Sequence, residues 1–218
     1  MKDFEFKMPA RVKFGEGISK QIGQVLRDMG YNKVFIATDK GIVAAGIIAQ
    51  IEEGLKAGNF DYVVYDEMIP DPTIEVVDAA ADVLKKSGAD VVLAVGGGSP
   101  IDTAKAICLL QTHEGSIRDY LFGGTKSVTK PIMPLICIPT TAGTGSEMTA
   151  ASVITNNQNK TKVSVTHENL IPKYALIDPM LQLGCPPFIT GTTGMDALTH
   201  AIESYISTRS NPISEAMS

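Results

Sequence analysis

The sequence has little that would tie it to a membrane, a nucleic acid or an oxidising compartment. Its three cysteines, Cys108, Cys137 and Cys185, are odd in number and lie in apolar surroundings, which argues against a disulfide framework. No apolar run approaches the ~20 residues that a membrane-spanning helix needs. The net charge is −5 and the basic residues are not clustered, so a nucleic-acid or anionic-membrane partner is not expected.

The composition is that of a globular protein. The chain has 218 residues, 44% of them hydrophobic, which is enough for a sizeable core in one large or two small domains. Residues 1–6 do not have the pattern of a secretory signal peptide, and the chain has no internal repeat. We therefore expect a cytoplasmic protein whose cysteines are buried structural thiols.

Hydrophobic periodicity alternates between helix and strand as far as residue 138. Apolar residues at helical spacing predict helices over 18–29, 47–57, 76–84 and 100–110. Compact or alternating apolar runs predict strands at 4–6, 12–14, 33–38, 62–65, 91–95 and 132–138. Strands and helices in this alternation predict a Rossmann-like α/β fold with a parallel sheet covered on both faces. Such sheets bind ligands at the carboxyl ends of their strands.

The pattern changes after Pro139. Residues 152–155 and 162–166 predict two strands joined by a polar turn, and 174–177 predict a last short strand. From Pro186 onward the apolar spacing is only helical. We therefore predict an α/β domain over residues 1–183, followed by the first helices of an all-α domain over 184–218. Because a lone amphipathic helix is marginal in water, we expect that most of the second domain is missing.

The most informative segment is VVLAVGGGSPIDTAK, residues 91–105, in which a buried strand runs through three glycines into a helix. Glycines let the backbone approach a ligand, and a helix N-terminus offers free N–H donors at the positive end of its dipole. We expect Ser99 to be the N-cap, Pro100 the first helical residue and Asp102 the partner in a capping-box-like pair. The segment predicts a phosphate site, and the alternative is a tight turn without a ligand.

Two further segments follow predicted strands. Asp39 closes the strand 33–38, where a carboxylate can hydrogen-bond a ribose 2′-hydroxyl and repel a 2′-phosphate. The alternative for Asp39 is a loop acid or a helix cap. Residues 139–147, PTTAGTGSE, form a dense row of hydroxyls and small residues that can donate hydrogen bonds to phosphates. The alternative for this loop is an ordinary polar connection.

Asp196 and His200 are candidate metal ligands. They lie four residues apart on a predicted helix, so both side chains leave the same face. A carboxylate oxygen and an imidazole nitrogen together suit iron(II) or zinc, and a surface hydrogen-bonded pair is the alternative. The apolar stripe beside them predicts a buried face. Lys162, in the predicted hairpin, is a candidate phosphate or ribose contact, with a solvated lysine as the alternative.

Residues 96–105, 139–147 and 194–203 together resemble the iron-containing alcohol dehydrogenase family, and Asp71-Pro72-Thr73 and Asp178-Pro179 also resemble its pattern. The resemblance covers essentially the whole chain. It implies a dehydroquinate synthase-like domain that binds NAD, a helical domain, and an active site in the cleft between them. The implied residues are Asp39, Gly97, Gly98, Ser99, Asp102, Thr140, Thr141, Thr144 and Lys162 for NAD, and Asp196 and His200 for iron(II) or zinc.

The function that this resemblance implies is an NAD-dependent, metal-dependent oxidoreductase that interconverts a small primary alcohol or diol and its aldehyde. The family pattern needs two further histidines downstream, and His113 and His167 fall outside any matching motif. A catalytically inactive NAD-binding fragment and a zinc glycerol dehydrogenase-like enzyme therefore remain alternatives, with a dehydroquinate synthase as a further one. Exposed edge strands near the N-terminus lead us to expect a homodimer or a larger homo-oligomer.

Overall fold

The computed structural model describes residues 3–8 and 10–218. Its strands are β1 (Arg11–Phe14), β2 (Lys33–Ala37), β3 (Asp61–Tyr65), β4 (Val91–Gly96), β5 (Leu135–Pro139), β6 (Ala151–Asn156), β7 (Thr161–Thr166) and β8 (Tyr174–Ile177). Its α-helices are α1 (Ile22–Met29), α2 (Lys40–Ala44), α3 (Ile47–Ala57), α4 (Ile74–Ser87), α5 (Gly98–Thr112), α6 (Pro187–Ile206) and α7 (Pro212–Met217). Short 3-10 turns are η1 (Ile18–Gln21), η2 (Ile117–Asp119), η3 (Ser146–Met148), η4 (Glu168–Leu170) and η5 (Pro179–Gln182).

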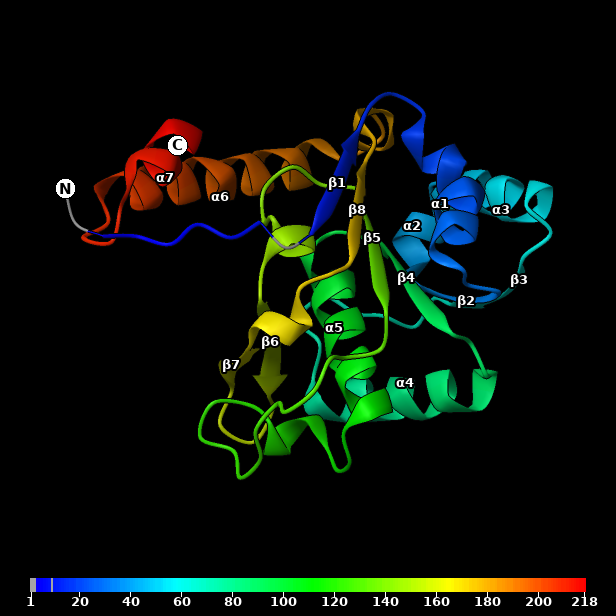
Figure 1. Ribbon diagram of the computed structural model, residues 1–218, viewed down its shortest axis with the longest axis horizontal. Helices are drawn as coiled ribbons and strands as arrows, with labels where there is room; N and C mark the ends of the chain where they lie inside the picture. Colours follow the sequence, from blue (N-terminus) through cyan, green and yellow to red (C-terminus); the bar gives the residue numbers. More distant parts are fainter. Residues whose placement is uncertain (1–2, 9) are drawn as a thin grey trace.

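A parallel sheet forms the centre of the structure (Figure 1). In the described residues it has six strands in the order β1-β8-β5-β4-β2-β3, while β6 and β7 form a separate antiparallel pair. In β2, Val34 and Ile36 pack with α1 and α3 on one face, and Phe35 and Ala37 pack with α4 and α5 on the other. A strand that is buried on both faces needs apolar residues at every position, which explains the unbroken apolar runs. The predicted α/β class and covered parallel sheet are confirmed.

The direction of the strand order reverses between β2 and β4. The chain moves from β2 outward to β3, returns to β4 on the other side of β2, and then continues to β5. The carboxyl ends of these strands are tied together: Thr38 Oγ1 donates to the Val95 carbonyl at 2.9 Å, and the Thr140 N–H donates to the Gly96 carbonyl at 3.0 Å. Ligands of open α/β sheets bind at such a switch point, so this edge is where a site is expected.

A buried carboxylate holds the first part of the chain to the last strand of the sheet. β1 pairs with β8, and Asp178, which is 1% exposed, follows β8 directly. Asp178 accepts hydrogen bonds from the Gly17 N–H at 3.0 Å, the Ser19 N–H at 3.1 Å, the Ser19 hydroxyl at 2.6 Å and the Met180 N–H at 3.1 Å. Burial by itself would raise the pKa of Asp178, but these hydrogen bonds outweigh it and leave the pKa lowered. Asp178 is therefore a structural anchor.

Some predicted boundaries are wrong. No strand forms at residues 4–6 among those described, where Phe4 and Phe6 are 43% and 47% exposed and lack the neighbour that a strand needs. The strand predicted at 132–138 begins only at Leu135, because Pro134 immediately before it has no N–H to donate to a ladder. The helix predicted at 18–29 divides into the 3-10 turn η1 and the α-helix α1.

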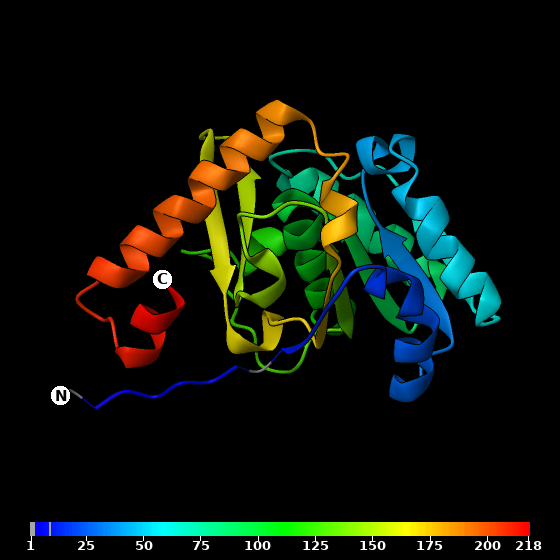
Figure 2. The ribbon, with the colours of Figure 1, turned by 90° about the horizontal axis from the view of Figure 1, so that it is seen from above.

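The C-terminal helices extend away from the α/β body, as Figures 1 and 2 both show. None of residues 187–206, all of which the structure describes, is buried, and Leu198 and Tyr205 are 51% and 61% exposed. The prediction that this face is buried is therefore wrong for this structure: α7 contacts α6, but the contact leaves these side chains exposed. The boundary between residues 183 and 184 stays a prediction. Among the described residues, we find no helix whose length and apolar content would let it cross a membrane.

Candidate functional site

The glycine-rich turn after β4 begins its helix earlier than the sequence suggests. Gly97 is the N-cap and α5 begins at Gly98, so the prediction of Ser99 as the N-cap is wrong. Gly96 at the end of β4 has a φ of +150°, which residues with a Cβ rarely adopt, and a Cβ there would lie 2.8 Å from the Pro100 ring. The Ile101 N–H bonds back to the Gly97 carbonyl at 3.3 Å. Since proline has no N–H, Gly98 and Ser99 supply the free donors of the first turn.

The hydroxyl-rich loop after β5 lies against this turn. A Cβ on Gly98 would approach the Thr144 methyl carbon to 2.8 Å, so a larger residue would require Thr144 to move. The same loop also supports α6, because a Cβ on Gly143 would lie 2.5 Å from the Thr193 carbonyl oxygen. Glycines at these two positions therefore let the turn, the loop and α6 meet closely.

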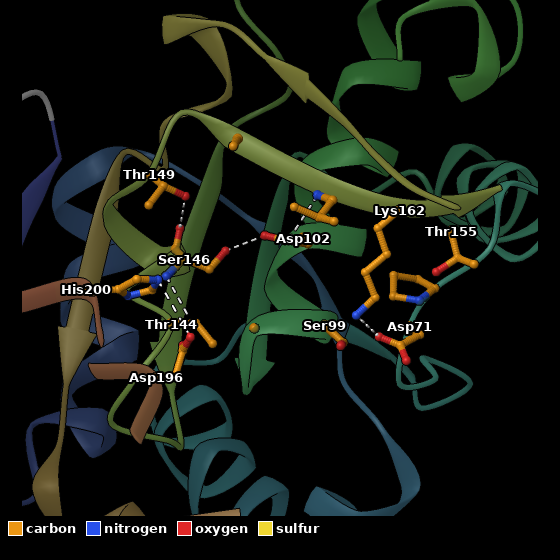
Figure 3. A pocket seen from close by; sticks show the side chains of 14 residues that line it. Asp71, Ser99, Asp102, Thr144, Ser146, Thr149, Thr155, Lys162, Asp196 and His200 are labelled. Carbon is orange, nitrogen blue, oxygen red and sulfur yellow. Dashed lines mark hydrogen bonds and ion pairs between the residues drawn. The ribbon is translucent and has the colours of Figure 1, made fainter. Parts of the chain in front are cut away.

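Two hollows meet at Gly98, Ser99 and Thr144, which line both of them. The larger, of about 680 Å³, also includes Asp39, Gly97, Thr140 and Thr141 in its lining. The smaller, of about 460 Å³, includes Asp71, Asp102, Lys162, Asp196 and His200 (Figure 3). The structure therefore brings all of the sequence-predicted site residues to one extended crevice at the carboxyl edge of the sheet. These residues come from segments that are far apart in the chain.

Asp39 stands at the end of β2 and caps the next helix. Its side chain accepts a hydrogen bond from the Ile42 N–H at 3.0 Å, so the alternative of a helix cap describes its local role. Its second oxygen lies 3.7 Å from the place of a Cβ on Gly96, which sets the carboxylate beside the glycine-rich turn. One oxygen is thus used by the helix, while the residue still lines the larger hollow.

Asp102 does not form the predicted capping-box-like pair, because Ser99 is inside the helix. Its carboxylate instead accepts hydrogen bonds from the Ser146 hydroxyl and from the Val153 N–H, the latter at 3.0 Å. Asp102 therefore joins α5 to the hydroxyl-rich loop and to β6, while it also lines the smaller hollow.

Lys105 is a polar residue of the site region that sequence reasoning missed. It is fully buried in α5, and its ammonium contacts the same loop as Asp102. Burial lowers the pKa of Lys105, and the Asp102 carboxylate opposes that shift. Burial likewise raises the pKa of Glu147, the last residue of the loop motif. The available signal was a lysine in the middle of a helix that is apolar on all sides, because such a lysine must find buried partners.

Asp196 and His200 face the smaller hollow from α6. The Asp196 Oδ1 and His200 Nε2 atoms are 3.6 Å apart, and the two side chains are 42% and 54% exposed. The spacing on one helix face is as predicted, and both side-chain types are ordinary ligands of iron(II) and zinc. Within residues 3–8 and 10–218, no group of three or more His, Cys, Asp or Glu side chains could hold a metal ion. The pair thus fits part of a metal site.

Lys162 lies on the opposite side of the smaller hollow, as Figure 3 shows. Its ammonium pairs with the Asp71 carboxylate at 2.6 Å, and the two side chains are 63% and 65% exposed. The segment with Asp71 is held to the hairpin by the Thr155 N–H, which donates to the Pro72 carbonyl at 2.7 Å. Lys162 is therefore a solvated lysine with a carboxylate partner, at the mouth of the hollow.

The structure has a parallel sheet, a glycine-rich strand-to-helix turn at its switch point and a long crevice across that turn. These features define the class of Rossmann-like nucleotide-binding proteins. Within this class, the chain belongs to the iron-containing alcohol dehydrogenase family. Residues 9–179 match the family model "Iron-containing alcohol dehydrogenase", and residues 190–218 match "Fe-containing alcohol dehydrogenase family, C-terminal". The family consists of alcohol dehydrogenases that use NAD and iron.

Individual relatives agree with this assignment. The chain is 41% identical to alcohol dehydrogenase 4 of Saccharomyces cerevisiae over 97% of its own length and 55% of that protein. It is 38% identical to an NAD-dependent methanol dehydrogenase of Bacillus methanolicus over the same two shares. Thus the chain spans about half the length of the curated relatives it matches.

Solved structures give the same result. A 1,3-propanediol oxidoreductase superposes with a TM-score of 0.92 and 34% identity, covering 99% of this chain and 56% of that one. The sulfoacetaldehyde reductase from Bifidobacterium kashiwanohense in complex with NAD+ also has a TM-score of 0.92, with 33% identity, and covers 99% of this chain and 57% of that one.

Proposed function

We propose that this chain binds NAD along the two joined hollows. The observation that carries the proposal is that Gly98, Ser99 and Thr144 line both hollows, so one extended ligand can cross the glycine-rich turn. Backbone N–H groups at the start of α5 suit the pyrophosphate, because they combine free donors with the positive end of a helix dipole. The hollow with Asp39, Thr140 and Thr141 would then take the adenosine half. The hollow with Lys162, Asp196 and His200 would take the nicotinamide half.

We infer that the enzyme to which this chain belongs interconverts a small primary alcohol or diol and its aldehyde. Hydride moves between the substrate carbon and the nicotinamide, so the residues of the chain have to orient the two and exclude water. The relatives support the substrate class, since their names include a methanol dehydrogenase and a 1,3-propanediol oxidoreductase. Asp196 and His200 would hold iron(II) or zinc, which when bound acts as a Lewis acid toward the alcohol oxygen.

A second candidate function is NAD binding without catalysis by the 218-residue chain itself. It is favoured by the metal-donor set: in the described part of the chain, Asp196 and His200 are not joined by a third donor. Both lie on a helix whose apolar stripe is exposed, so metal binding would have to order its own site. Nucleotide titrations combined with alcohol-dependent NADH formation separate the two candidates.

Replacing Gly98 with valine tests the crossing point. The new side chain would displace Thr144 and occupy the approach to the backbone N–H groups, so NADH affinity should fall at least about tenfold while the chain remains folded. Calorimetric titration measures this. Gly15→Val is the matched control, because a Cβ at Gly15 meets nothing within 4 Å and Gly15 lines neither hollow. Unchanged NADH affinity in a folded Gly98→Val protein would show that the turn is only structural.

The charge of Asp39 should make the chain prefer NAD to NADP. A carboxylate beside a 2′-phosphate costs on the order of 1–3 kcal/mol, or roughly ten- to a hundredfold in affinity. Asp39→Gly should narrow this gap, although it also removes the cap of α2. Asp39→Asn is the sharper variant, because it keeps an oxygen for the Ile42 N–H and removes the charge. Equal affinities of the unmodified chain for NADH and NADPH contradict the prediction.

We infer a homodimer or a larger homo-oligomer. β1 lies at an edge of the sheet, and its Val12 and Phe14 side chains are 38% and 71% exposed. The exposed stripe of α6 adds a second apolar surface. Light scattering at micromolar concentration should therefore give at least twice the chain mass of 23.2 kDa. A monomeric mass at micromolar concentrations would contradict the predicted oligomer.

The purified chain should hold little metal and show no meaningful alcohol dehydrogenase activity. A tightly held iron(II) or zinc ion needs at least three protein ligands in fixed geometry, and the described residues offer Asp196 and His200. Elemental analysis and ethanol- or propanol-dependent NADH formation check both points. Stoichiometric metal together with activity that a chelator abolishes would overturn this prediction and indicate donors from a second copy. In that event Asp196→Ala and His200→Ala should each abolish metal binding and alcohol dehydrogenase activity.

A further inference from the structure

Lys105 is buried in α5 and is 0% exposed, while the residues that it contacts line the smaller hollow. Its ammonium donates to the Ser146 hydroxyl at 3.1 Å, to the Thr149 hydroxyl at 2.9 Å and to the Ala151 carbonyl at 2.7 Å. Three donors thus meet three acceptors, all of them on the chain that follows β5. Burying an ammonium is costly, and an apolar residue of similar shape is often at least as stabilising. A role in stability alone therefore explains this lysine poorly.

Two hydrogen bonds fix the orientation of the Ser146 hydroxyl. It accepts from Lys105 and donates to the Asp102 carboxylate, and Lys105 lies 3.7 Å from the same carboxylate oxygen. Ser146 is 4% exposed, so solvent offers it little competition. Lys105 and Asp102 are one helical turn apart in α5, and together they hold Ser146 from one side.

Ser146 in turn orients Thr144. The Ser146 N–H donates to Thr144 Oγ1 at 3.3 Å, which engages that oxygen as an acceptor and leaves the hydroxyl proton to be directed into the crevice. Thr144 is also the residue that Gly98 touches where the two hollows meet. A chain of contacts therefore runs from Lys105 through Ser146 to the residue at the crossing point.

We propose that Lys105 is a positioning residue that holds Ser146, and through it Thr144, against the glycine-rich turn at the place where the cofactor pyrophosphate crosses. The inference rests on the proposed binding of NAD. The adenosine side of the crevice has its own support, because the Thr140 N–H bonds to the Gly96 carbonyl without the help of Lys105. Loss of Lys105 should therefore weaken ligands that carry a pyrophosphate and spare those that do not.

Three variants of the 218-residue chain test this role. Lys105→Met removes the three donors at similar length, Thr144→Val removes the hydroxyl at the crossing point, and Leu109→Ala is a control for general loss of packing in α5. Leu109 is fully buried one turn further along the helix. In titrations with NADH, the affinity of Lys105→Met should fall by about tenfold or more. Its affinity for adenosine, measured by ligand-observed NMR, should change by less than about twofold. In the Thr144→Val background, Lys105→Met should cost at most about twofold more, as expected for residues in one pathway.

Amide hydrogen exchange supplies a readout that does not depend on a nucleotide. The Ser146 and Val153 N–H groups, which bond to Thr144 and Asp102, should exchange faster in Lys105→Met and at the unmodified rate in Leu109→Ala. If Lys105→Met does not fold, Ser146→Ala breaks the same link and should give the same pattern.

Several results would overturn the role of Lys105. These are unchanged NADH affinity in Lys105→Met, equal losses for NADH and adenosine, or additive effects of Lys105→Met and Thr144→Val. If the unmodified chain binds no NADH, the proposed function fails separately. Amide hydrogen exchange then tests only whether Lys105 positions the loop. Unchanged exchange rates of the Ser146 and Val153 N–H groups in Lys105→Met would contradict that role.

Discussion

The close approach of Gly98 and Thr144 is the constraint on which the site depends. A Cβ on Gly98 would lie 2.8 Å from the Thr144 methyl, so the turn and the loop meet only because Gly98 has no side chain. This contact joins the two hollows and presents the first N–H groups of α5 between them. The strands that lead into the turn and the loop are direct neighbours, since Gly96 pairs with Pro139 in the sheet register. Two loops that start side by side can form the two walls of one crevice.

The sequence predicted the fold class, and the candidate site residues that it indicated lie in one crevice, because both depend on local pattern. Unbroken apolar runs mark strands that are buried on both faces, and a strand that passes through glycines into a helix marks the turn. The details that failed depend on distant partners. Ser99 has the chemistry of an N-cap, yet the turn places Gly97 in that position. Asp102 has the spacing of a capping pair, but its partners Ser146 and Val153 lie more than forty residues away. Spacing along the chain could not reveal Lys105 as part of this network.

The exposed face of α6 limits how firmly Asp196 and His200 are held. Gly143 holds the start of the helix against the hydroxyl-rich loop, which brings Asp196 and His200 to the crevice. The apolar stripe beyond them is left in solvent. A metal ligand needs a rigid neighbour to fix its geometry, and a helix docked near one end supplies less rigidity than one that is packed along its length. The part of the crevice proposed for the nucleotide is therefore more firmly packed than the part proposed for the metal.

The anchor at Asp178 also sets the order in which the molecule can assemble. The carboxylate binds the backbone of Gly17, which is 161 residues earlier, and β1 pairs with β8 across a similar separation. A nascent chain therefore completes β2, β4 and β5 before its first strand acquires a neighbour. Long-range pairings of this kind form slowly, because the intervening chain must be ordered first. During synthesis the edge of β5 that β8 will cover stays unpaired. The N-terminal segment also has no strand to pair with until β8 has left the ribosome.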